Sequence, residues 1–138
     1  MSNAVWLTLA LPQWYFSSLL MPFEAGPLTL VPAIGGSALV VGTLLGIRAR
    51  ARLLLFFGAL ALLSHALVAL AGLLRGILRG TDSSSVLIFA LLQLAAATYL
   101  VYRADNARLP AILLAIFTVS YALFATFIAG MSLSDSWL

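Results

Sequence analysis

The sequence predicts an all-α integral membrane protein, a four-helix transmembrane bundle that follows a short interfacial segment at the N-terminus. Of the 138 residues, 64% are hydrophobic and 8% are charged, whereas soluble domains average about 45–50% and about 25%. The mean hydropathy is +1.15, and the polar residues gather in a few short gaps between apolar runs. This is the layout of a membrane domain, so residues 1–138 are predicted to form a single transmembrane domain.

The first 26 residues are apolar but do not resemble a regular span. Pro12 interrupts the run over 4–21, which also carries Trp6, Trp14 and Tyr15. Proline inside a helix removes a backbone hydrogen bond, and tryptophan and tyrosine favour the headgroup level of a bilayer. We therefore expect residues 1–26 to lie in the interface, with a short kinked fifth span as the alternative.

Four longer apolar runs follow, each long enough to cross a bilayer at about 1.5 Å per helical residue. Their expected bounds are 28–47, 53–75, 86–102 and 109–131. Pro110 suits the first turn of the last helix. The second run is uncharged from Leu53 to Leu74 and holds His65, the sole histidine of the chain. We expect the other helices to be arranged around this run.

Glycines recur at helical spacing on the first two runs. Gly42 and Gly46 form a GxxxG pair on the first run, and Gly72 and Gly76 fall on the small-residue face of the second. Small residues let two helix backbones approach closely in a membrane. We predict that these positions pack helices within one subunit, with dimerisation through the GxxxG pair as the alternative.

All seven basic residues are arginine, and their distribution predicts the orientation of the chain. Arg75 and Arg79 lie at one end of the spans, and the other five lie in the two loops at the opposite end. Positively charged loops tend to stay in the cytoplasm, so we expect these five to face it in a bacterial-type inner membrane. Contact with anionic lipid or phosphate is their alternative role. They are Arg48, Arg50, Arg52, Arg103 and Arg108.

One polar side chain per span falls at a similar depth. Counted at about 1.5 Å per residue, Ser37, Gln93 and Thr118 lie about 15 Å from the arginine loops and His65 about 20 Å, near the centre of a hydrocarbon layer of about 30 Å. His65, Gln93 and Thr118 share helix faces with small residues, and Ser37 is one position from such a face. Polar groups at this depth are costly unless they are paired. We predict a midplane polar cluster of these four residues, joined by hydrogen bonds.

Three roles are open for His65. A neutral imidazole bonded to Gln93 or Thr118 would hold the helices in register, at about 0.6–2 kcal/mol per interhelical hydrogen bond. A histidine that titrates near neutral pH would instead serve a proton or substrate pathway. Haem ligation would require a lone axial histidine or a pair across a dimer. The structural role is the expected one, and no cofactor is predicted.

A stripe of aromatic side chains on the last run lies roughly opposite its alanines. It consists of Phe117, Tyr121, Phe124 and either Phe127 or Ile128. We expect this stripe to contact lipid or a partner subunit, with a pigment or quinone site as the alternative.

The sequence lacks the patterns that mark enzymes and metal proteins. The absence of cysteine excludes disulfides, thiolate catalysis and cysteine metal sites. There is no P-loop, no GxSxG elbow and no carboxylate pair within one span. No catalytic residue and no metal site are therefore predicted. The net charge of +3 is too small and too dispersed to indicate a nucleic-acid partner.

The expected function is that of a non-enzymatic membrane subunit. The length and four-span layout resemble those of small multidrug exporters, but the essential glutamate of that family lies inside its first span, whereas Glu24 precedes one here. The sequence is therefore assigned to no family. The expected partners are the lipid bilayer and either other membrane subunits or a second copy of the chain. The alternative is a small oligomeric transporter or channel with its site around His65, Gln93 and Thr118.

Overall fold

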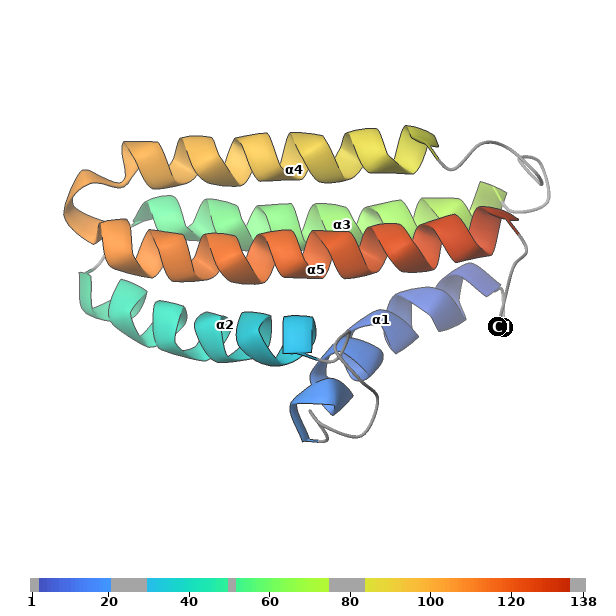
Figure 1. Ribbon diagram of the computed structural model, residues 1–138, viewed down its shortest axis with the longest axis horizontal. Helices are drawn as coiled ribbons and strands as arrows, with labels where there is room; N and C mark the ends of the chain where they lie inside the picture. The colour runs from blue at the N-terminus through green and yellow to red at the C-terminus, as the bar shows by residue number, and fades with distance from the viewer. Residues whose placement is uncertain (1–2, 21–29, 50–51, 75–83, 135–138) are drawn as a thin grey trace.

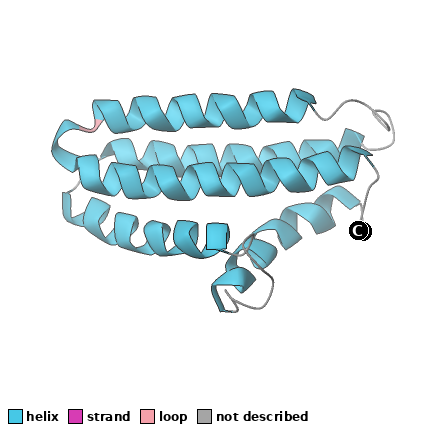
Figure 2. Cartoon of the chain, viewed as in Figure 1, coloured by secondary structure: helices cyan, strands magenta, loops and turns pink. Residues whose placement is uncertain are grey.

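The computed structural model describes residues 3–20, 30–49, 52–74 and 84–134, and every regular element in these ranges is a helix (Figure 2). Four of the helices are long and apolar enough to cross a membrane. The predicted fold class, an all-α transmembrane four-helix bundle, is confirmed. In chain order the elements are α1 (Asn3–Leu20), α2 (Leu30–Ala49), η2 (Arg52–Leu54), α3 (Leu55–Leu74), α4 (Ser84–Arg103), η3 (Asp105–Ala107) and α5 (Arg108–Ser134).

α5 lies at the centre of the bundle. In Figure 1, α4 lies along one side of α5, and α3 lies next to α5. Helices α2 and α1 follow one another along the other side of α5. Helices α2, α3 and α4 all pack against α5. More than half of its apolar stretch is buried, a larger share than in any of the other three spans. The expectation that the chain is arranged around residues 53–74 was therefore wrong, because α5 occupies that central position.

Small side chains allow α5 to take the centre. In a membrane, lipid tails are as apolar as leucine, so helices gain from close packing rather than from leaving water. Alanines permit such close approach on more than one face of α5, whereas α3 carries exposed leucines along much of its length. The alanines of α5 that are at most 1% exposed are Ala111, Ala122, Ala125 and Ala129.

α1 is one continuous helix through Pro12. It starts beside the C-terminal end of α5 and runs obliquely toward the start of α2 (Figure 1). It packs against α3 and α2, so α1 and α2 together cover one flank of the bundle. α1 is not one of the four helices whose length and apolarity suit a span, and its position at the interface stays a prediction.

Tight turns bring the arginines to one end of the bundle. η2 leads from α2 into α3, and Ala104 with η3 leads from α4 into α5, where the Ala107 amide donates to the Ala104 carbonyl at 3.2 Å. Pro110 lies in the first turn of α5, where the lack of an N–H group costs no helical hydrogen bond. The described arginines at this end are Arg48, Arg52, Arg103 and Arg108. Glu24, Arg50, Arg75, Gly76 and Arg79 lie outside the described residues.

Candidate functional site

Polar groups gather in the interior where α1, α3 and α5 meet. His65 is half-buried on α3, and its Nε2 atom shares a hydrogen bond of 2.8 Å with the hydroxyl of Tyr121 on α5. The two rings meet edge to face, with centroids 5.5 Å apart, and Tyr121 is 2% exposed. Both residues lie near the middle of their helices. The bond therefore ties α3 to α5 at mid-height.

Tyr15 of α1 enters the same region. Its side chain is fully buried, and its hydroxyl lies 2.5 Å from Oγ of Ser120 on α5. Ser120 donates its own proton to the Phe117 carbonyl at 2.8 Å, so Tyr15 is the donor to Ser120. Gly35 of α2 provides the space, because a Cβ atom there would collide with both hydroxyl groups. Helices α1, α2 and α5 therefore meet at this one point.

The ring of Tyr15 packs edge to face on three aromatic rings of α5. The centroid distances are 5.9 Å to Phe117, 4.9 Å to Tyr121 and 5.7 Å to Phe124. Such pairs contribute about 0.5–1.5 kcal/mol each beyond the area that they bury. The prediction that the aromatic stripe contacts lipid or a partner subunit was wrong for Phe117 and Tyr121, because α1 covers them within the same chain. Phe127 of the stripe is exposed.

Sequence reasoning missed Tyr15 as an interior residue. It was assigned to the headgroup level because Pro12 interrupts the segment and because tryptophan and tyrosine favour that level. A signal was nevertheless present, since Leu11 and Tyr15 are four residues apart on one helix face and both are fully buried. That face matches the aromatic stripe of α5 in chemistry. A comparison of the face of α1 that carries Leu11 and Tyr15 with the aromatic stripe of α5 would have predicted that the two helices pack together.

The four residues of the predicted midplane cluster lie in different settings. Gln93 on α4 is 3% exposed, and its Nε2 donates to the Leu60 carbonyl of α3 at 3.0 Å. Thr118 is fully buried and donates to the Leu114 carbonyl of its own helix at 2.8 Å. Ser37 is exposed on α2. In the part of the chain that the structure describes, no hydrogen bond joins Gln93, Thr118 or Ser37 to His65.

Helix register explains why the cluster does not assemble. Leu60 is five residues from His65 along α3, which is about 7.5 Å at 1.5 Å per residue. Gln93 therefore contacts α3 at a point that is more than one helical turn closer to the arginine-rich end than His65 is. Thr118 bonds to its i−4 carbonyl, the local alternative that threonine commonly takes inside a helix. Ser37 faces outward because Gly35 and Ala38 form the buried face of α2 at this level. Depth along each span was counted from the sequence, but the direction of each side chain depends on the packing.

Gln93 is only partly satisfied. Among the described residues, its Oε1 atom and Ser132 Oγ are the buried side-chain polar atoms that have no hydrogen-bond partner. An unpaired buried acceptor costs about 1–3 kcal/mol. Gln93 thus uses only its donor group in the contact between α3 and α4.

The predicted packing glycines lie inside the chain where they are described. A Cβ atom on Gly42 would lie 3.0–3.3 Å from side-chain atoms of Leu113 and Leu114 on α5, and one on Gly46 would collide with Leu54. Gly72 is half-buried on α3. The GxxxG pair of α2 therefore faces α5 and η2 of the same chain.

The interior site holds an imidazole, two phenols and a serine hydroxyl. Asp105, the one carboxylate in the described part of the chain, lies at the arginine-rich end. Within the same residues, no group of three or more histidine, aspartate or glutamate side chains could hold a metal ion. The interior groups can tie helices together, and the imidazole can exchange a proton with a neighbouring hydroxyl.

Comparisons with models of known protein families, with curated proteins and with solved structures find no match to this chain.

Proposed function

We propose that the chain is a non-enzymatic subunit of a bacterial-type inner membrane that binds a transmembrane helix of another subunit. That subunit belongs to a larger complex or is a second copy of the same chain. The observation that supports this proposal is a groove along α5, between α2 and α4, of about 540 Å³.

The lining of the groove has the chemistry that close packing of another helix requires. Small residues on α4 and α5, including Ala97, Thr98 and Ala115, line it and permit close approach of another backbone. Its two hydroxyl groups, on Thr98 and Ser120, already donate to carbonyls of their own helices. A partner helix would therefore need no polar group to satisfy this surface. Large exposed side chains, including Ile34 and Leu123, form the rim.

The interior polar groups support a structural role for the site. The side chains of Gln93 and Thr118 are bound to backbone carbonyls, and His65 is bound to Tyr121. Three pockets on the described helices are lined without His65, Gln93 or Thr118. A substrate pathway would require these polar side chains to face a common cavity.

A small oligomeric transporter is the second candidate, and the position of His65 near the middle of α3 favours it. A titratable imidazole at mid-height of two spans is typical of proton pathways in membrane proteins. The two candidates differ in their response to His65→Ala. As a structural tie, its loss should lower the unfolding midpoint in detergent, whereas as a pathway residue, its loss should abolish proton flux in proteoliposomes while the midpoint is unchanged.

Native mass spectrometry of the tagged protein, extracted gently from its own membranes, tests the main proposal. We expect a complex with another subunit or with a second copy, and we expect Thr98→Phe to release it by filling the groove. Ala66→Phe is the matched control, because Ala66 is exposed on α3 and lies outside the groove. A monomer without bound protein, or a complex that survives Thr98→Phe, would overturn the proposal.

A further inference from the structure

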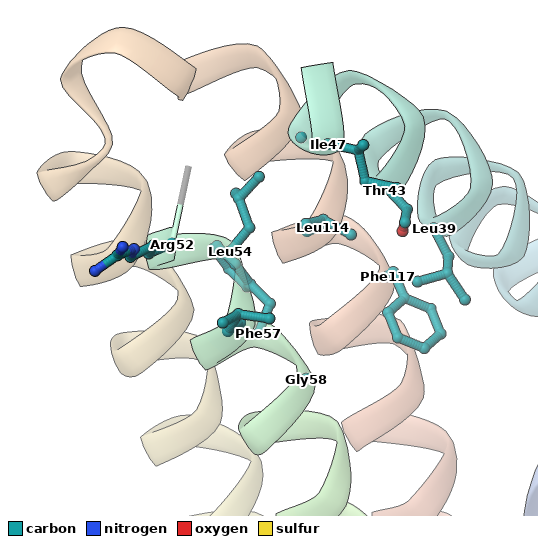
Figure 3. A pocket seen from close by; sticks show the side chains of 11 residues that line it. Leu39, Thr43, Ile47, Arg52, Leu54, Phe57, Gly58, Leu114 and Phe117 are labelled. Carbon is teal, nitrogen blue, oxygen red and sulfur yellow. The ribbon is translucent and has the colours of Figure 1, made fainter. Parts of the chain in front are cut away.

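A second pocket lies at the arginine-rich end, between α2 and the start of α3. Its volume is about 430 Å³, within the range of about 300–1,000 Å³ that is usual for small-molecule sites. Its apolar lining includes Leu39 and Ile47 of α2, Leu54 of η2, and Phe57 and Phe117 (Figure 3). Thr43 and Arg52 are the polar residues of the lining. The pocket is therefore an apolar space whose lining includes two polar residues.

Glycine keeps part of this pocket open. A Cβ atom added to Gly58 would meet no described atom within 4 Å, although Gly58 belongs to the lining. At Gly46, by contrast, the missing side chain is replaced by Leu54, which packs directly on the α2 backbone. The opening beside Gly58 is therefore unfilled by the residues that the structure describes. In a membrane it is filled by something apolar, because water there would have few hydrogen-bond partners.

Arg52 is the one charged residue of the lining, and its charge indicates the class of ligand. Figure 3 shows Arg52 beyond Leu54, with its guanidinium group turned away from Leu39 and Phe117. Arg48 follows Ile47 of the lining and is also exposed. Neither arginine forms an ion pair within the described residues. An uncompensated guanidinium group beside an apolar space suits a molecule with an acyl chain and an anionic head, because guanidinium binds phosphate through paired hydrogen bonds.

We propose that this pocket binds an anionic phospholipid. One acyl chain lies between α2 and α3 against Leu39 and Phe57, and the phosphate lies at the bundle end against Arg52, with Arg48 adding positive charge. Basic residues near a membrane surface attract anionic lipid headgroups, which favours an anionic over a zwitterionic headgroup. The apolar walls favour a lipid over free phosphate. This site does not depend on the groove between α2 and α4.

The test measures lipid binding to the full-length protein by native mass spectrometry, with phosphatidylglycerol and phosphatidylcholine as probes. We expect phosphatidylglycerol to bind at least tenfold more tightly than phosphatidylcholine. Gly58→Leu, which fills the opening, and Arg52→Gln, which removes the charge, should each weaken phosphatidylglycerol binding at least tenfold. Inorganic phosphate, added as a third probe, should not compete at concentrations that leave phosphatidylglycerol bound.

Two control variants make the result specific. Gly130→Leu adds the same side chain on α5, where a Cβ atom would also meet no described atom within 4 Å. Arg103→Gln removes an arginine from the same end, one that lies 5.9 Å from the centroid of the Tyr99 ring. Both should bind phosphatidylglycerol as the unmodified chain does. Equal binding of the two lipids, unchanged binding by Gly58→Leu, or displacement by phosphate alone would overturn the proposal.

Discussion

Replacing Gly35 with alanine tests the point where α1, α2 and α5 meet. The added Cβ atom would collide with the hydroxyl of Tyr15 and the side chain of Ser120. The overlap therefore disturbs both the hydrogen bond of Tyr15 to Ser120 and the packing of α2 against α5. At Gly130 the same substitution meets no described atom within 4 Å, so it should only improve helix propensity. The two variants are expected to change the free energy of unfolding in opposite directions.

The magnitude of the Gly35→Ala effect follows from three contributions. An interhelical hydrogen bond in a membrane contributes about 0.6–1.7 kcal/mol, and overpacking a tight contact costs about 1–3 kcal/mol. Alanine in place of glycine returns about 0.5–1 kcal/mol through backbone entropy. The net loss for Gly35→Ala is therefore about 1–4 kcal/mol. Gly130→Ala should gain about 0.5–1 kcal/mol.

The assay is reversible unfolding in mixed micelles with increasing sodium dodecyl sulfate, followed by tryptophan fluorescence. A second variant isolates the collision, because Tyr15→Phe removes one of the two hydroxyl groups that the new Cβ atom meets. In the double variant, Gly35→Ala should cost less than it does alone, as expected for residues that share a contact. A Gly35→Ala variant as stable as Gly130→Ala, or additive effects of the substitutions at Gly35 and Tyr15, would show that the collision does not occur.

Two further predictions concern the hydrogen bonds between helices. Tyr121→Phe keeps the ring and removes the bond to His65, so the free energy of unfolding should fall by about 0.6–2 kcal/mol in the same titration; an unchanged value would show that the bond does not stabilise the bundle. Gln93→Leu removes one hydrogen bond together with an unpaired buried acceptor, so its effect should stay below about 1 kcal/mol. A loss several times larger would show that Oε1 has a partner in the membrane.

The fold class could be predicted because span recognition depends on local properties. Length, apolarity and the arginine-containing gaps are each visible within one segment. The choice of central helix is different, since it depends on which helix has small side chains on several faces at once. The alanines of α5 indicate this position, whereas the prediction relied on the single histidine of α3 and therefore chose the wrong helix.

The candidate site shows the same division between local and tertiary information. Counting residues placed His65 near mid-height, where the structure has it bonded to Tyr121. The identity of that partner depends on the rotation of two helices about their axes, which one sequence does not specify. Tyr15 and Ser120 are 105 positions apart in the chain, and their contact also requires the missing side chain of Gly35. No pattern within a single segment contains that combination.

The junction at Gly35 also bears on the proposed partner site. Val31 and Ile34 of α2 line the groove along α5, and Ile34 is the neighbour of Gly35 in the chain. Ser120 is part of both the junction at Gly35 and the groove, because it accepts the hydrogen bond from Tyr15 and also lines the groove. A displacement of α2 at Gly35 would therefore move one wall of the groove relative to its floor on α5. If a helix of another subunit occupies the groove, Gly35→Ala should weaken that association along with the bundle, whereas Gly130→Ala should leave it intact.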